Sequence, residues 1–152
     1  MRISICGKLP KSFSLSRKEL KSAAKLFATL SSKRVGVYWH EVAVYLGDDA
    51  ESDEMHQAIM NIEGATDVIT QAYDAIPPEK PGIFGELFVN TDQALREAAK
   101  RKNQSPAKEL LLYVAHGMDH LSGADDHSEK GYLSMRRREL NWIKKWFEEE
   151  RK

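Results

Sequence analysis

Residues 105–127 read SPAKELLLYVAHGMDHLSGADDH, and they hold three of the five histidines in the chain. Ser105 can cap a helix, and Pro106 suits the first helical position. Mostly apolar side chains continue from there to Leu121, and Gly123 is suited to ending the helix. The stretch therefore predicts a long, buried helix that carries histidines near its C-terminal end.

Two of these histidines have the spacing of metal ligands. His116 and His120 are four residues apart, which places both rings on one helical face with Cβ atoms roughly 5–6 Å apart. Catalytic zinc takes three protein ligands and leaves a fourth position for water. Gly123 permits a turn that returns either Asp126 or His127 to the ion, and only one is expected to bind. We therefore predict one zinc ion, with His116 and His120 also at the catalytic centre.

Zinc peptidases carry a similar helix with the motif His-Glu-x-x-His, in which the glutamate after the first histidine is the general base. Gly117 occupies that position here, and Asp119 is expected to point away from the metal face. Peptide hydrolysis by that route is therefore disfavoured, and another hydrolytic substrate is favoured.

The rest of the chain predicts alternating strands and helices. Expected strands span residues 2–6, 41–46, 66–70 and 86–90; expected helices start near Ser16, Asp48, Thr91 and Glu129. The last helix, to about 149, is expected to bury a stripe of Leu133, Leu140, Ile143, Trp146 and Phe147. Together these elements predict one α+β domain over residues 1–152, with a small mixed sheet of about four strands and about five helices. The pattern does not determine the order of the strands in the sheet.

Composition and charge also limit the class of protein to which this chain can belong. The 152 residues are 41% hydrophobic and 30% charged, which is typical of a globular chain. No stretch is long enough for a membrane span, and residues 1–6 lack a signal-peptide pattern, so a cytoplasmic protein without a membrane partner is expected. The net charge of zero counts mildly against a nucleic-acid substrate. Residues 8–34 nevertheless hold eight basic side chains, either a phosphate-facing surface or a solvated helix face.

Three motifs, in order, resemble the YbeY family of endoribonucleases and rRNA maturation factors. The family signature His-Gly-x-x-His-Leu-x-Gly-Tyr-Asp-His is matched by residues 116–126, HGMDHLSGADD. Residues 66–70, TDVIT, match a family strand motif, and residues 85–89, GELFV, match another. The resemblance implies an α+β fold and a zinc-bound hydrolase of single-stranded RNA. It also implies a role in 16S rRNA 3′-end maturation and ribosome quality control, with an rRNA precursor and the ribosome or its small subunit as partners.

The chain departs from the family pattern at three positions. Asp126 stands where the family has its third histidine, and oxygen ligation would make the site harder and less zinc-selective. Met60 stands where the family usually has an arginine that could stabilise developing negative charge, so weaker catalysis is expected. Gln71 replaces an aromatic residue after the first strand motif.

Further residues are candidates for supporting roles. Asp125 could orient an imidazole or merely shape the turn. Thr66 and Asp67 could brace the sheet near the site, or act only as hydrogen-bonding residues at a strand end. Two functions other than RNA cleavage stay open: another zinc hydrolase, peptidases included, and a non-catalytic ribosome-assembly factor with a metal site. The sequence leaves the oligomeric state open.

Overall fold

The computed structural model describes residues 1–150, so the expected domain over 1–152 extends two residues beyond the described part. The predicted α+β class is confirmed, with four strands and five α-helices in that part of the chain; the short 3₁₀ helix η1 is an element that the sequence pattern did not predict. The elements are β1 (Arg2–Gly7), η1 (Lys11–Phe13), α1 (Arg17–Val35), β2 (Trp39–Gly47), α2 (Asp49–Met60), β3 (Val68–Asp74), β4 (Ile83–Asn90), α3 (Thr91–Lys100), α4 (Pro106–Leu121) and α5 (Glu129–Glu150).

The four strands form one mixed sheet in the order β1-β2-β4-β3. β1, β2 and β4 run parallel, and β3 pairs antiparallel with β4 at one edge. A Pro- and Gly-rich loop joins β3 to β4, so these two consecutive strands form a hairpin. The parallel pair β1 and β2 needs a crossover connection, and α1 supplies it.

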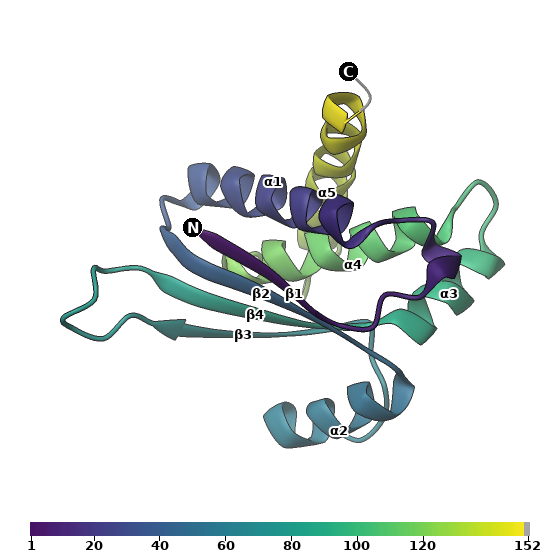
Figure 1. Cartoon of the computed structure of the whole chain (residues 1–152), viewed down its shortest axis with the longest axis horizontal. Coiled ribbons are helices and arrows are strands. Elements are labelled where there is room, and N and C mark those ends of the chain that lie inside the picture. The colour runs from purple at the N-terminus through teal and green to yellow at the C-terminus, as the bar shows by residue number, and fades with distance from the viewer. Residues whose placement is uncertain (151–152) are drawn as a thin grey trace.

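Helices lie on both sides of the sheet, as Figure 1 shows: α1 and α4 are on one face, and α2 is on the other. Alternate side chains of the central strands, such as Val42, Val44 and Leu87, are fully buried on the side of α1 and α4. The hydrophobic core therefore lies between the sheet and these two helices, with the inner side of α5 completing it. Within residues 1–150, no helix combines the length and the hydropathy needed to cross a membrane.

Local side-chain chemistry explains where the helices begin. Ser16 and Glu19 form the predicted capping box at α1, since each side chain bonds the other residue's backbone N–H. Asp48 and Glu51 do the same at α2. At α4 the Oγ of Ser105 accepts a hydrogen bond from the N–H of Lys108 at 3.1 Å, and a proline follows the cap as predicted.

The predicted apolar stripe of α5 is wrong in part. Leu133 and Leu140 are 52% and 51% exposed, whereas Ile143 and Trp146 are buried as expected. The buried face also includes Met135, Glu139 and Trp142. The helix is therefore rotated from the expected phase, and the rotation turns a glutamate toward α4.

Candidate metal centre

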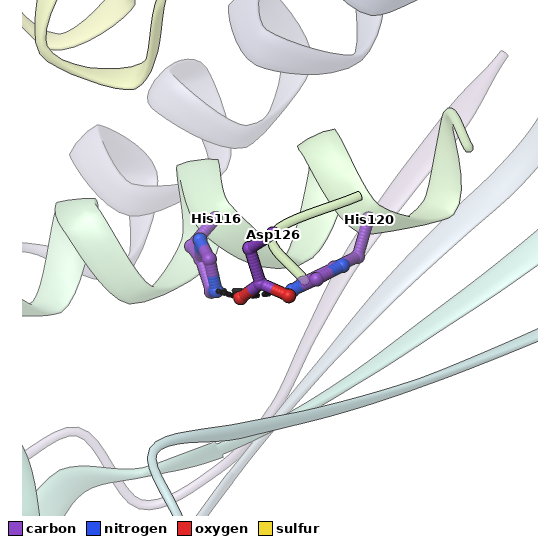
Figure 2. A group of neighbouring side chains, drawn as sticks. All are labelled: His116, His120 and Asp126. Atoms are coloured by element: carbon purple, nitrogen blue, oxygen red, sulfur yellow. Dashed lines mark hydrogen bonds and ion pairs between the residues drawn. The ribbon is translucent and has the colours of Figure 1, made fainter. Parts of the chain in front are cut away.

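His116, His120 and Asp126 converge at the C-terminal half of α4 (Figure 2). The Nε2 atoms of the two histidines lie 3.0 Å apart. The Oδ2 atom of Asp126 lies 3.8 Å from Nε2 of His116 and 3.6 Å from Nε2 of His120. Each residue thus offers one ligand atom, and all three atoms lie within 4.8 Å of one another.

The turn after α4 brings the aspartate back toward the helix. Gly123 has a φ of 90°, a left-handed conformation that glycine adopts without strain. Its N–H donates to the carbonyl of His120 at 2.9 Å, and the N–H of Ala124 donates to the carbonyl of Asp119 at 3.1 Å. These bonds end the helix and reverse the chain, so that Asp126 faces the histidine pair.

The other two predicted residues of this loop lie away from the histidine pair. The side chain of His127 is 91% exposed, and its Nε2 is 3.6 Å from Asp125. Asp125 in turn accepts a hydrogen bond from the backbone N–H of His127 at 2.7 Å. Asp125 therefore hydrogen-bonds within its own turn, and within residues 1–150 it makes no hydrogen bond or ion pair with His116 or His120.

Glu139 is the residue that sequence reasoning missed. Its Oε2 lies 2.9 Å from Nδ1 of His116, and the side chain is fully buried between α5 and α4. The other carboxylate oxygen, Oε1, is buried without a hydrogen-bond partner. A buried, half-satisfied carboxylate costs stability. Its one directed contact therefore points to a role in fixing the His116 ring.

The two groups of this contact influence each other's titration. Burial raises the pKa of Glu139. Burial alone would lower the pKa of His116, but the hydrogen bond and the negative charge of Glu139 outweigh it, so the pKa of His116 is raised. Because Nδ1 of His116 is engaged by Oε2 of Glu139, the Nε2 atom of the same ring is the one directed at His120 and Asp126.

Gly117 explains how α4 comes so close to the sheet. A Cβ atom added there would lie 2.6 Å from Cδ2 of Leu87 and 3.1 Å from Cγ2 of Val68. A side chain at this position would require either a shift of the helix away from β3 and β4 or repacking of Leu87. The close approach therefore disfavours the glutamate that serves as general base in His-Glu-x-x-His.

Asp119 lies on the buried side of α4 and forms a second link to α5. Its two carboxylate oxygens accept from Nε and Nη2 of Arg138 at 2.8 and 3.0 Å. Arg138 and Glu139 are neighbours on α5, and their partners Asp119 and His116 are three residues apart on α4. Two polar links thus set the position of α5 against the helix that carries the histidines. Among residues 1–150, Asp119 is not one of the grouped ligand residues, and its carboxylate is engaged by Arg138 instead.

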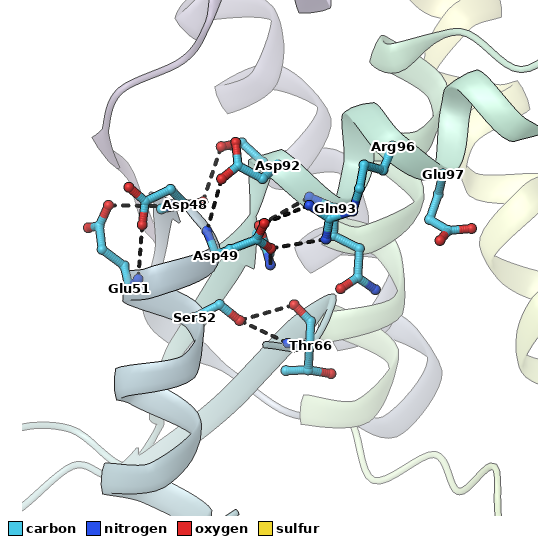
Figure 3. Close-up of polar contacts among 12 residues, drawn as sticks. Asp48, Asp49, Glu51, Ser52, Thr66, Asp92, Gln93, Arg96 and Glu97 are labelled. Atoms are coloured by element: carbon cyan, nitrogen blue, oxygen red, sulfur yellow. Dashed lines mark hydrogen bonds and ion pairs between the residues drawn. The ribbon is translucent and has the colours of Figure 1, made fainter. Parts of the chain in front are cut away.

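Thr66 and Asp67 precede β3 and are tied to their surroundings. Backbone groups of Thr66 exchange two hydrogen bonds with the hydroxyl of Ser52 on α2, at 3.1 and 3.0 Å (Figure 3). The carboxylate of Asp67 accepts from the backbone N–H of Val68 at 2.7 Å. Asp67 and His116 both line a polar cavity that side chains of α3, α4 and α5 border. Thr66 and Asp67 both fix the chain at the start of the edge strand, and Asp67 alone faces the neighbourhood of the site.

The donor set fits a zinc ion. Two imidazole nitrogens and one carboxylate oxygen are ligands that zinc accepts, and three protein ligands leave a position for water. The hydrogen bond from Nδ1 of His116 to a carboxylate is the support that metal-bound histidines commonly have. His120 and Asp126 are only partly buried, so solvent reaches the cluster from one side.

Comparison with known proteins shows similarity over most of the chain. The family model described as "Endoribonuclease YbeY" matches residues 9–146. A protein named "Endoribonuclease YbeY" from Chlamydia pneumoniae is 31% identical over 123 residues, which cover 79% of this chain and 77% of that protein. One of the same name from Rhodopirellula baltica is 36% identical over 104 residues, or 68% of this chain. The aligned part spans only about half, 52%, of the R. baltica protein.

A solved structure has the same fold. The solution structure of TM1509 from Thermotoga maritima superposes with a TM-score of 0.61 at 25% sequence identity. The match covers 98% of this chain and 91% of that one. The arrangement of sheet and helices described above is therefore shared with an experimentally determined protein.

Proposed function

This chain belongs to the YbeY family, and from that premise we propose that it is a metal-dependent endoribonuclease, a hydrolase of phosphodiester bonds in RNA. The observation that carries the proposal is the convergence of His116, His120 and Asp126 on one point. We propose these three as the ligands of one zinc ion, with His127 outside the coordination sphere. The exposure of His127 and its pairing with Asp125 support that choice.

The remaining residues of the site have distinct tasks in this proposal. Zinc would polarise a phosphoryl oxygen of the substrate, and it would lower the pKa of a bound water to about 7. Glu139 holds the proton at Nδ1 of His116, which keeps the ring in one orientation and Nε2 available as a ligand. The link from Asp119 to Arg138 keeps α5, and therefore Glu139, in register with α4. Asp125 shapes the loop that presents Asp126.

We also propose a biological setting, which rests on the resemblance of residues 116–126 to the family signature. In that setting the substrate is a 16S rRNA precursor, cleaved during 3′-end maturation or ribosome quality control. The protein would act in the cytoplasm on the ribosome or its small subunit. A single domain over residues 1–152 would carry the activity.

The activity test uses zinc-loaded protein and two substrates. We expect about one zinc per chain by elemental analysis and cleavage of single-stranded RNA, with no cleavage of casein. The His120→Ala variant is expected to lose both the zinc and the RNA cleavage. Stoichiometric zinc in that variant would remove His120 from the site, and cleavage of casein instead of RNA would favour the peptidase alternative.

A second candidate function is a non-catalytic ribosome-assembly factor with a structural metal. Met60, which stands where the family usually has an arginine, is 53% exposed at the end of α2 and favours this candidate because it offers no positive charge. Turnover separates the two candidates. Protein that binds ribosomes and zinc but cleaves no RNA would support the assembly role.

A further inference from the structure

A polar cavity of about 230 Å³ lies beside the metal-ligand cluster. Side chains from α3, α4 and α5 line it, together with Asp67 from the segment before β3. His116 belongs to this lining, so the cavity and the cluster share a side chain. A ligand in the cavity would therefore lie next to a group held at the cluster.

The acidic side chains of the cavity already have partners. Glu109 is buried and accepts from Gln104 at 2.8 Å and from Arg101 at 3.4 Å. Glu97, which Figure 3 shows on α3, pairs with Lys100 at 3.3 Å. The carboxylate of Asp67 accepts from the backbone N–H of Val68 at 2.7 Å and from the hydroxyl of Thr66 at 3.3 Å. Glu97 and Glu109 are thus paired with cations, whereas the carboxylate of Asp67 is hydrogen-bonded by neutral groups.

Arg136 is the lining cation without a carboxylate partner. Within residues 1–150 no carboxylate oxygen lies within 4.0 Å of its guanidinium. Its closest polar contact is the hydroxyl of Tyr132 at 3.4 Å, and its Cζ lies 5.5 Å from the centre of the same ring. Tyr132 is exposed and leaves the guanidinium without a countercharge.

We propose that Arg136 binds a backbone phosphate of the RNA strand, next to the phosphodiester that the His116–His120–Asp126 cluster holds. The planar guanidinium matches the oxygen atoms of a phosphate with two parallel N–H donors, and such charge-assisted bonds are strong. The proposal rests on the RNA-cleaving function proposed above. It adds a second contact on the same strand, supplied by α5 rather than by α4.

The direct test measures binding rather than cleavage. The probe is a short, unstructured phosphorothioate oligouridylate, which keeps one negative charge per linkage and slows hydrolysis. Its affinity for the zinc-loaded protein is measured by fluorescence anisotropy over a range of salt concentrations. For Arg136→Gln we expect about tenfold weaker binding at low salt. We also expect the slope of log K against log salt to become shallower by about 0.7, which corresponds to one lost phosphate contact on a single strand.

Two further variants make the test specific. Arg137→Gln removes the same charge from the neighbouring position of α5, which lines a different hollow, and it is expected to bind like wild type. Arg136→Lys keeps the positive charge but loses the two parallel N–H donors of the guanidinium. It should therefore show the wild-type slope of log K against log salt and an affinity between those of wild type and Arg136→Gln. Thermal melting of each variant confirms that it is folded. Equal affinities and slopes for Arg136→Gln and Arg137→Gln would overturn the subsite.

The kinetic measurement separates this proposal from the proposed function. On cleavable single-stranded RNA, Arg136→Gln should raise KM by about tenfold with a smaller change in kcat. If the wild type binds the probe through Arg136 but cleaves no RNA, the proposed function fails and the subsite remains as a binding site. If RNA is cleaved and Arg136→Gln matches Arg137→Gln in KM as well as in binding, the subsite fails alone.

Discussion

The carboxylate of Glu139 reaches across from α5 to the Nδ1 atom of His116 on α4, a contact of 2.9 Å between residues 23 positions apart in the chain. Glu139 is fully buried, and one of its oxygens has no partner. A protein core that served packing alone would place an apolar side chain there. The contact therefore identifies Glu139 as a positioning residue for the imidazole.

This relationship predicts that Glu139→Gln lowers zinc affinity by about 10- to 100-fold, because loss of a carboxylate behind a metal-bound histidine typically has that effect. The change keeps the size of the side chain and removes its charge. The measurement is competition for zinc with a calibrated chelator. Glu149→Gln, at an exposed position of the same helix, is the matched control and should bind zinc like wild type. Equal affinities for the two variants would show that Glu139 is only a structural residue.

Asp126 and His127 give a second prediction, which addresses the choice that the sequence left open. Asp126→Ala removes a proposed ligand and should leave the protein without stoichiometric zinc after dialysis against a weak chelator. His127→Ala should retain one zinc per chain, because that side chain is 91% exposed and away from the histidine pair. Asp126→His should retain zinc as well, since a third imidazole is a common zinc ligand. The reverse result for the two alanine variants would make His127 the ligand.

Periodicity and capping residues were enough to predict most of the fold. Ser16 with Glu19, and Ser105 with Pro106, marked the beginnings of two helices because capping depends on a few neighbouring residues. The strand order was not predictable, since hydrophobic alternation says nothing about which strands pair. The edge strand β3 pairs with β4, which separates it from β2, its predecessor in the chain, and only the folded sheet reveals this.

The ligand cluster was partly predictable for the same reason. His116 and His120 share a helix, so their spacing alone brought them together. Glu139 escaped prediction because it lies on another helix, whose buried face was predicted from its leucines. A usable signal existed: Glu139 follows Met135 by four residues and precedes Trp142 by three, which is the spacing of a buried helical face. A glutamate in that phase indicates a buried polar contact.

Gly117 provides a third prediction, on stability. In Gly117→Ala the new Cβ meets the side chain of Leu87 at 2.6 Å, so the helix must shift or the leucine must repack. We expect unfolding free energy to fall by about 1–3 kcal/mol, as overpacking of a core usually costs, together with weaker zinc binding because both histidines move with the helix. Urea denaturation and chelator competition measure the two effects.

Leu87→Ala supplies the internal control for that clash. Alone it leaves a cavity and should cost about 2–5 kcal/mol. Combined with Gly117→Ala, it provides room for the added methyl group, so the double variant should be more stable than the sum of the two single losses predicts. Strict additivity would contradict the close approach of α4 to the sheet.

The fourth prediction concerns pH and the contact between α2 and α3. Asp49 accepts from Nη1 and Nη2 of Arg96 at 2.6 and 3.0 Å (Figure 3). It also accepts from Nδ2 of Asn90 at 2.9 Å. The hydrogen bonds from Arg96, then that from Asn90, lower the pKa of Asp49 below its ordinary value of 3.8. The folded state therefore binds a proton at Asp49 less readily than the unfolded state does. Its contribution to stability is complete well above that value and is lost as pH falls through the lowered native pKa.

Asp49→Asn should therefore destabilise the protein near neutral pH and lose its effect in acid. Both partners are substantially exposed, so solvent screening limits the expected loss to about 0.2–1 kcal/mol. Urea denaturation at a series of pH values measures the difference from wild type, which should shrink toward zero as the carboxyl becomes protonated. Glu54→Gln, on an exposed position of the same helix, is the charge-matched control and should show little difference at any pH. A difference for Asp49→Asn that persists unchanged in acid would mean that the carboxylate charge does not stabilise this contact.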